Sequence, residues 1–178
     1  MIHQDIILVP CGHFEKRFLE TIARRVGFEF NCPVNTVEVR IELGDAYDPG
    51  RRQYNADKLL KALSSLVLAN NSSKIIGLFD VDLFIPILTY IFGQAQLSGR
   101  YAIASAYRLK NERYGMKSDD VLLQERFIKE VIHELGHTMG LVHCYNPVCV
   151  MRSGTYLEDI DQKGSTRCYA CRKITQVL

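Results

Sequence analysis

The chain has 178 residues, of which 47% are hydrophobic and 24% are charged, a composition typical of one globular domain. A chain of this length buries about two thirds of its unfolded surface, which is enough for a normal hydrophobic core. The formal net charge of +2, and short basic groups with no array of aromatic side chains beside them, argue against a nucleic-acid-binding protein.

The first half of the chain alternates strand and helix patterns. Residues 5–9 form a short apolar run that predicts a strand, and residues 14–26 carry apolar side chains at helical spacing. Residues 36–43 alternate apolar and polar side chains, which predicts a half-buried strand. After a loop of turn residues, Asn55 is expected to cap a helix that runs to about Asn70.

The second half contains two further strands and one long helix. Residues 74–82 and residues 101–109 predict strands. The uncharged stretch at residues 83–97 is too short and too interrupted by Pro, Gly and Gln to span a bilayer. Ser118 or Asp119 is expected to cap the long helix. The apolar face of this helix is predicted to comprise Leu122, Phe127, Ile128, Val131, Ile132 and Leu135.

The order of these elements predicts a layered fold. Strand, helix, strand, helix, strand implies right-handed crossovers, and therefore a mainly parallel sheet with helices packed against it. Residues 101–107 are rich in small side chains, so they are either an ordinary strand under a helix or an edge against which a peptide backbone can lie. Asp80 and Asp82 could bind a metal, but we expect alternating carboxylates at a strand end to be solvated turn charges.

Three of the five histidines lie in one short segment with the pattern H-E-x-x-H-x-x-G-x-x-H. Residues four apart lie on one face of a helix, so His133 and His137 can bind the same metal ion. Gly140 tolerates a positive φ and can turn the chain so that His143 becomes a third ligand. Glu134 projects beside the metal, where a general base for a bound water belongs. Three imidazoles leave a fourth tetrahedral position open for that water, which predicts a catalytic zinc site.

Four of the six cysteines begin directly after the third histidine and read C-x4-C-x18-C-x2-C. Two close pairs match the spacing of a tetrahedral four-cysteine zinc site. Two disulfides could use the same thiols, but residues 1–10 lack a basic segment and have too short an apolar run for a signal peptide. A reducing compartment, expected to be the cytoplasm, favours a structural zinc bound by Cys144, Cys149, Cys168 and Cys171. The isolated Cys11 and Cys32 are interpreted as ordinary thiols.

The adjacent residues His143 and Cys144 constrain how the two sites lie. Neighbouring side chains in a bent segment cannot easily reach one small ion, so they are expected to bind two separate zinc ions. Residues 144–178 are too few to build a hydrophobic core of their own, and segments of that size commonly need a metal. The thiolate site is expected to replace that core.

The extended histidine motif, followed by Met151 eight residues after His143, resembles the metzincin clan of zinc peptidases, in which a methionine lies beneath the metal in a tight turn. The thiolate site would then hold Met151 under the catalytic site through Cys149, two residues before it in the chain. Without this role, Met151 would be an apolar gap-filler. With the interleaved cysteines, the segment is similar to the archaemetzincins. The matching residues are His133, Glu134, His137, Gly140, His143, Cys144, Cys149, Met151, Cys168 and Cys171.

The resemblance implies an α+β, metzincin-like fold with αβα layers. Its expected parts are a twisted, mainly parallel sheet with an antiparallel edge strand, a long active-site helix and a small zinc-stapled C-terminal subdomain. In metzincins the strand that corresponds to residues 101–107 is this antiparallel edge. Residues 1–178 would form one catalytic domain, with an N-terminal subdomain at 1–143 and a C-terminal subdomain at 144–178.

The resemblance also implies a zinc metallopeptidase that hydrolyses peptide bonds with zinc-activated water and Glu134 as general base. Tyr145 or Tyr156 could add a hydrogen bond to the oxyanion, although either is as readily a surface residue. We expect a monomer that acts on short peptides, with no nucleic-acid or membrane partner. Two alternatives stay open: a two-zinc binding or structural protein with little turnover, and a hydrolase of a non-peptide amide.

Overall fold

A five-stranded sheet forms the centre of the computed structural model, which describes residues 5–68 and 72–176. Its strands are β1 (Ile6–Pro10), β2 (Val34–Thr36), β5 (Lys74–Phe79), β7 (Gly93–Ala95) and β8 (Tyr101–Ser105). They lie in the order β2-β1-β5-β8-β7, and only the last pair, β7 with β8, is antiparallel. The predicted mainly parallel sheet with one antiparallel edge is confirmed.

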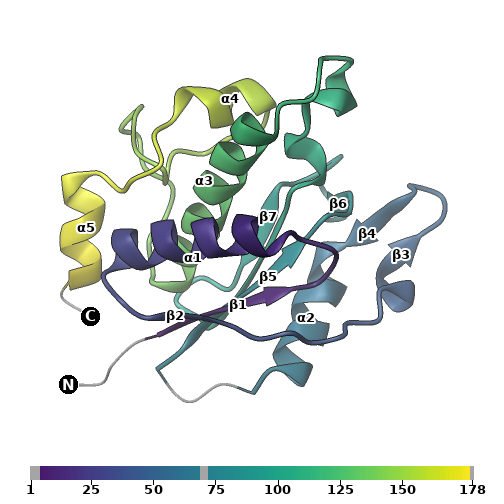
Figure 1. Ribbon diagram of the computed structural model, residues 1–178, viewed down its shortest axis with the longest axis horizontal. Coiled ribbons are helices and arrows are strands. Elements are labelled where there is room, and N and C mark those ends of the chain that lie inside the picture. Colours follow the sequence, from purple (N-terminus) through teal and green to yellow (C-terminus); the bar gives the residue numbers. More distant parts are fainter. Residues whose placement is uncertain (1–4, 69–71, 177–178) are drawn as a thin grey trace.

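Helices cover both faces of this sheet (Figure 1). Helices α1 (Lys16–Phe30) and α3 (Asp120–Thr138) pack on one face, and α2 (Ala56–Leu66) packs on the other. Successive side chains of β5 point to opposite faces of the sheet: Ile75 packs in the core on the α2 side and Ile76 in the core on the α1 and α3 side. The result is the predicted αβα arrangement.

The remaining elements are short. They are β3 (Tyr47–Asp48), β4 (Gln53–Asn55) and β6 (Leu83–Phe84), which form a second sheet, three 3-10 turns at Gly44–Ala46, Tyr107–Leu109 and Asn111–Tyr114, and the C-terminal helices α4 (Leu157–Gln162) and α5 (Tyr169–Gln176). Within the described residues, no helix is both long and apolar enough to cross a membrane.

Side-chain caps start two of the three long helices. Asn55 Oδ1 accepts a hydrogen bond of 3.1 Å from the backbone N–H of Lys58, and Asp119 Oδ1 accepts one of 2.9 Å from Leu122. Each bond satisfies an N–H that the helix itself leaves without a partner. The prediction of Asn55 as a cap is confirmed, and Asp119 rather than Ser118 caps α3.

The helix bounds differ slightly from the prediction. Helix α2 ends at Leu66, before the predicted end at Asn70, which lies outside the described residues. On α3, Leu122 is only partly buried, and its neighbour Leu123 packs against the core instead. The periodicity of the other five predicted positions is retained, because each of them is buried in the core.

The strand predicted at residues 36–43 is wrong for most of its length. Strand β2 ends at Thr36, and its three residues pair with β1. The alternating apolar side chains that follow still turn to one side, where Val39, Ile41 and Leu43 pack against the α2 side of the core. Burial of every second side chain therefore occurs here without a partner strand.

The edge strand was also assigned to the wrong residues. Strand β8 pairs in parallel with β5 (Ile75 opposite Tyr101) and lies one strand inside the edge. The antiparallel edge is β7, at Gly93–Ala95, which a tight turn at residues 96–100 connects to β8. Three residues of Gly, Gln and Ala carry no strand pattern of their own, and pairing with β8 alone makes this segment a strand.

Asp80 and Asp82 are ion-paired rather than freely solvated. Asp82 is buried, and its carboxylate accepts a hydrogen bond of 2.8 Å from Nε of Arg108. Asp80 Oδ2 lies 2.6 Å from Nζ of Lys110. The expectation of solvated turn charges is therefore wrong, because the segment after β8 returns two cations to the end of β5. Neither carboxylate belongs to the two clusters of metal-binding residue types found among the described residues.

Candidate metal centres

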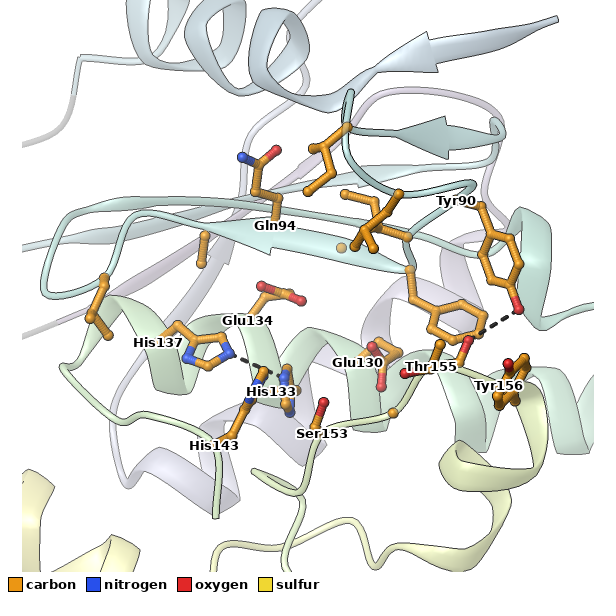
Figure 2. Close-up of a pocket in the computed structure, with 18 of the residues that line it drawn as sticks. Tyr90, Gln94, Glu130, His133, Glu134, His137, His143, Ser153, Thr155 and Tyr156 are labelled. Atoms are coloured by element: carbon orange, nitrogen blue, oxygen red, sulfur yellow. Dashed lines mark hydrogen bonds between the residues drawn. The ribbon is translucent and has the colours of Figure 1, made fainter. Parts of the chain in front are cut away.

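The central cleft lies between the edge strand and the long helix, with a volume of about 640 Å³ (Figure 2). Strand β7 forms one wall, α3 forms the floor, and residues 153–156 close the opposite side. His133, Glu134 and His137 project from α3 into this cleft (Figure 2). They share one face because they lie within one turn of the helix.

A left-handed turn at the end of α3 brings in the third histidine. Gly140 has φ +83°, a backbone conformation that residues other than glycine rarely adopt. The N–H of Leu141 donates a hydrogen bond of 3.0 Å back to the carbonyl oxygen of Gly136. The chain then returns beneath the helix, and the ring of His143 lies 5.3 Å from that of His133 and 5.0 Å from that of His137. One nitrogen of each ring lies within 4.8 Å of the others.

The tautomers of two of these rings follow from their hydrogen bonds. Nδ1 of His133 lies 2.9 Å from the carbonyl oxygen of Val150, and Nδ1 of His137 lies 2.7 Å from that of Leu141. A carbonyl only accepts, so each Nδ1 carries the proton. Burial lowers the pKa of both rings, which keeps them neutral, with their lone pairs on Nε2.

These lone pairs provide a test of whether the donors fit a metal. The Nε2 atoms of His133 and His137 face each other at 3.1 Å, where two lone pairs repel unless a cation lies between them. A tetrahedral zinc with ordinary Zn–N bonds would separate them by about 3.3 Å. Three neutral imidazoles with the side toward the cleft left open are the donor set of a catalytic zinc. The residues present therefore fit that ion.

Glu134 lies buried beside the histidines. Burial, and to a smaller degree the nearby Glu130, raises the pKa of Glu134 well above its usual range. Its side chain fits under β7 only because residue 93 is glycine. A Cβ at Gly93 would lie 2.7 Å from Cγ of Glu134 and 2.7 Å from the carbonyl oxygen of Ile103. Glycine here lets the edge strand approach the glutamate closely.

Met151 lies fully buried beneath α3. A Cβ at Gly136 would overlap its sulfur, so glycine on the helix makes room for the methionine. The N–H of Cys144 donates 2.9 Å to the carbonyl of Met151, which links the methionine turn to the chain just after His143. Gly136 and Met151 together bring the methionine under the histidine cluster.

The four predicted cysteines form a second cluster. The sulfurs of Cys144 and Cys168 are 3.8 Å apart, as are those of Cys149 and Cys171, and all four lie within 4.8 Å of one another. A tetrahedral zinc with 2.3 Å bonds to sulfur would place its ligands about 3.8 Å apart, whereas a disulfide needs about 2.05 Å. The backbone N–H of Cys171 lowers the pKa of Cys168 to about 7, which favours a thiolate ligand. This donor set fits a closed, structural zinc.

The C-terminal segment that carries these cysteines is tied to the rest of the fold by a buried cation. Nε of Arg167 donates 2.9 Å to the Glu29 carboxylate at the end of α1, and its guanidinium stacks 4.3 Å from the Phe30 ring. The N–H of Val150 bonds the carbonyl of Thr166 at 2.9 Å. The first contact holds the segment of Cys168 and Cys171 against α1. The second joins that segment to the one that carries Cys144 and Cys149.

The other residues considered from the sequence lie outside the two clusters. Tyr145 is fully exposed and does not line the cleft, whereas Tyr156 lines it with a largely exposed side chain. Burial raises the pKa of Cys11 to about 12 and that of Cys32 to about 11, as for unreactive thiols. The adjacent residues His143 and Cys144, which were expected to serve separate sites, lie in different clusters: His143 with the other two histidines and Cys144 with the other three cysteines.

Sequence reasoning missed three residues: Gly93 and Glu130, which line the cleft, and Lys163, which lies behind Glu130. Gly93 lies in a run with no clear pattern, and Lys163 belongs to a segment without periodicity. Glu130 had a signal, since it lies four residues before Glu134 and must share its face of the helix.

The layered fold, the edge strand over a long helix, and three converging histidines beside a buried glutamate define a zinc metallopeptidase of the metzincin type. The sequence profile of Peptidase family M54 matches residues 29–176. The chain belongs to this family and, within it, to the archaemetzincins.

Curated relatives and solved structures agree with this assignment. The archaemetzincin of Pyrococcus furiosus is 42% identical over 97% of this chain and 93% of its own length. That of Thermococcus kodakarensis is 34% identical over 94% and 93%. The crystal structure of archaemetzincin from Methanopyrus kandleri superposes with a TM-score of 0.85 at 31% identity, covering 98% of this chain and 94% of that one. A zinc-dependent peptidase from Methanocorpusculum labreanum gives 0.82 at 28% identity, covering 96% and 99%.

Proposed function

We propose that this zinc metallopeptidase cleaves peptide bonds with Glu134 as its general base and with two zinc ions per chain. The catalytic ion would be held by His133, His137 and His143, and the structural ion by Cys144, Cys149, Cys168 and Cys171. The observation that carries the proposal is the histidine geometry. Two Nε2 lone pairs face each other at 3.1 Å, and the open side of the cluster turns toward the cleft and Glu134.

The chemistry divides between the ion and the chain. A zinc ion bound by three imidazoles lowers the pKa of water and polarises a carbonyl group. Glu134 lies in the cleft beside the histidines, where its carboxylate can accept the proton of the attacking water. The same carboxyl group then delivers the proton to the leaving amine. Gly93 keeps the edge strand against Glu134 and limits the positions that the carboxylate can occupy.

Strand β7 supplies the surface on which a peptide can bind. Phe92 and Gln96 direct backbone groups toward β8, since the carbonyl of Phe92 accepts from Ser105 and the N–H of Gln96 donates to Tyr101. Backbone groups alternate along an antiparallel strand, so those of Gly93 and Ala95 point to the free edge. We infer that an extended substrate pairs with these two residues, as in strand addition.

Residues 1–178 act as one catalytic domain with subdomains at 1–143 and 144–178, as a monomer in the cytoplasm. The small size of the second subdomain leaves one side of the cleft shallow, which favours short peptides over folded proteins. A metal-binding protein without turnover is disfavoured, because a structural zinc has no use for a buried carboxylate beside it. Hydrolysis of a non-peptide amide remains the alternative reaction.

A digest of a peptide library by purified, zinc-loaded protein tests this function. Cleavage is expected at defined positions, and a peptide hydroxamate should inhibit it by chelating the zinc. If diverse libraries of varied length and end chemistry all stay intact, the non-catalytic alternative takes the place of the proposal. Cleavage that persists in a Glu134→Ala variant would come from a contaminating protease.

The proposed metal content gives a separate prediction. Elemental analysis should find two zinc ions per chain, and a chelator should remove the histidine-bound ion first, because the four-thiolate site is closed and more strongly charged. Absorption of the cobalt-substituted protein should show both a nitrogen-rich and an all-sulfur site. A protein with no zinc at its cysteines, and two disulfides by mass spectrometry, would contradict the assignment.

Replacing Gly93 by alanine tests the close approach of β7 to Glu134. The new methyl group would overlap Glu134 and the carbonyl of Ile103, so the edge strand must move. We expect the free energy of unfolding to fall by about 1–3 kcal/mol, as in overpacked cores, and the peptidase rate to fall as Glu134 is displaced. Gly44→Ala is the matched control, because no other atom lies within 4 Å of the Cβ it would add. Equal effects of the two variants on denaturant unfolding and on rate would contradict the prediction.

A further inference from the structure

The cleft contains a second buried glutamate that the proposed mechanism does not use. Glu130 lies on α3 one turn before His133, at about 5–6 Å between Cβ atoms, and it lines the cleft although only 4% of the residue is exposed (Figure 2). A carboxylate enclosed to this degree is costly unless it has partners. The contacts of its two oxygens therefore indicate what it can bind.

One oxygen of Glu130 is held from behind by a buried lysine. Nζ of Lys163 lies 2.8 Å from Oε1, and the lysine side chain is only 1% exposed. Lys163 follows α4, does not line the cleft, and has its nearest other acceptor, the carbonyl of Arg152, at 3.4 Å. This ion pair fixes the carboxylate in place and offsets part of its burial cost.

The other oxygen of Glu130 is available to a ligand. Among the residues that the structure describes, none donates a hydrogen bond to Oε2, whereas Oε1 is enclosed next to Lys163. Tyr90 and Tyr156 line the same end of the cleft, and the ring of Phe92 packs 5.6 Å from that of Tyr90. These rings can contact the aliphatic stem of a long side chain. An anchored carboxylate beside aromatic walls is complementary to a cation on a long stem.

The direction of β7 places this pocket relative to the scissile bond. The chain enters β7 from Tyr90, near the Glu130 end of the cleft, and continues to Gln94 above Glu134 (Figure 2). Antiparallel pairing is the more stable arrangement per residue. A peptide bound antiparallel to β7 therefore has its carboxyl-terminal part at the Glu130 end, with alternate side chains directed toward α3.

We propose that Glu130 is a specificity-determining residue that binds the ammonium or guanidinium group of a lysine or arginine directly after the scissile bond. This inference rests on the proposed peptidase function. The pair with Lys163 positions the carboxylate, and Oε2 accepts the hydrogen bond from the substrate. A site built to hydrogen-bond one group discriminates strongly against analogues that lack it, because its own buried polar atom is then left without a partner.

Matched peptides that differ only at this position test the proposal. With zinc-loaded enzyme, kcat/KM for lysine or arginine should exceed that for norleucine by about tenfold or more, and glutamate should be the poorest residue. Glu130→Gln alone leaves Lys163 unpaired in the interior and can fail to fold. The double variant Glu130→Gln/Lys163→Met removes both charges with little change in volume. It should lose the preference for a basic residue, while Glu125→Gln, a less buried glutamate on the same helix, should keep it.

Binding without turnover separates this inference from the proposed function. Two hydroxamate peptidomimetics, with lysine or norleucine after the zinc-binding group, are titrated into the zinc-loaded protein by calorimetry. The lysine compound should bind about tenfold tighter to the original protein and no tighter to the double variant. Tighter binding of the lysine compound without cleavage of any peptide would support the role of Glu130 in binding and would contradict the proposed peptidase function. Equal binding of the two compounds, or a lysine preference that survives in the double variant, would overturn the role of Glu130.

Discussion

Replacing Glu134 by glutamine is expected to lower kcat/KM for a cleavable peptide by about a hundredfold or more, because the general base is lost. Glutamine has nearly the same volume, so the contact with Gly93 is kept. The three histidines are untouched, and both zinc ions should stay bound. The melting temperature should stay unchanged or rise, since a buried carboxyl group with a raised pKa is replaced by a neutral amide.

Steady-state rates, elemental analysis and thermal unfolding of the same preparation check this result. Glu125→Gln on the same helix is the control for a change of net charge, and its rate should stay within about twofold. A Glu134→Gln variant that retains zinc and cleaves at the original rate would show that another group accepts the proton. Loss of zinc from the variant would instead make Glu134 part of the metal site.

Replacing Cys171 by serine is expected to remove the structural zinc and to loosen residues 144–176. Cys171 is buried, and its sulfur lies 3.8 Å from that of Cys149, two residues before Met151. Structural zinc sites contribute several kcal/mol to folding, and each kcal/mol is worth about 2–4 °C in a chain of this size. The melting temperature should therefore fall by about 10 °C or more, with activity lost because Met151 is no longer held beneath the histidines.

Cys32→Ser is the matched control, because Cys32 is a partly buried thiol outside both clusters. It should keep two zinc ions and lose little stability. Thermal unfolding, zinc content and proteolysis of the C-terminal segment distinguish the two variants. If Cys171→Ser kept both its second zinc and its full stability, the anchoring role of the cysteine cluster would be wrong.

The edge strand shows where prediction from the sequence reached its limit. A strand at residues 101–107 was correctly expected, but its neighbours were not, because pairing depends on segments distant in sequence and on the turn that precedes β8. The true edge, Gly93–Ala95, is too short and too small in its side chains to give a pattern. The requirement for glycine at position 93 is visible only in the folded chain, where Glu134 lies against it.

The sequence by itself determined the αβα layers, the long helix, the family, and the residue types and spacing of both candidate metal clusters. These follow from local rules: the four-residue separation of His133 and His137 on a helix, the turn that Gly140 permits, and the closeness of paired cysteines along the chain. Only the tertiary structure decided which strand borders the cleft, and it alone brought Lys163 to Glu130 and Arg167 to Glu29. Each of these ion pairs joins segments far apart in the chain, and no periodicity encodes a contact that forms only when separate elements pack together.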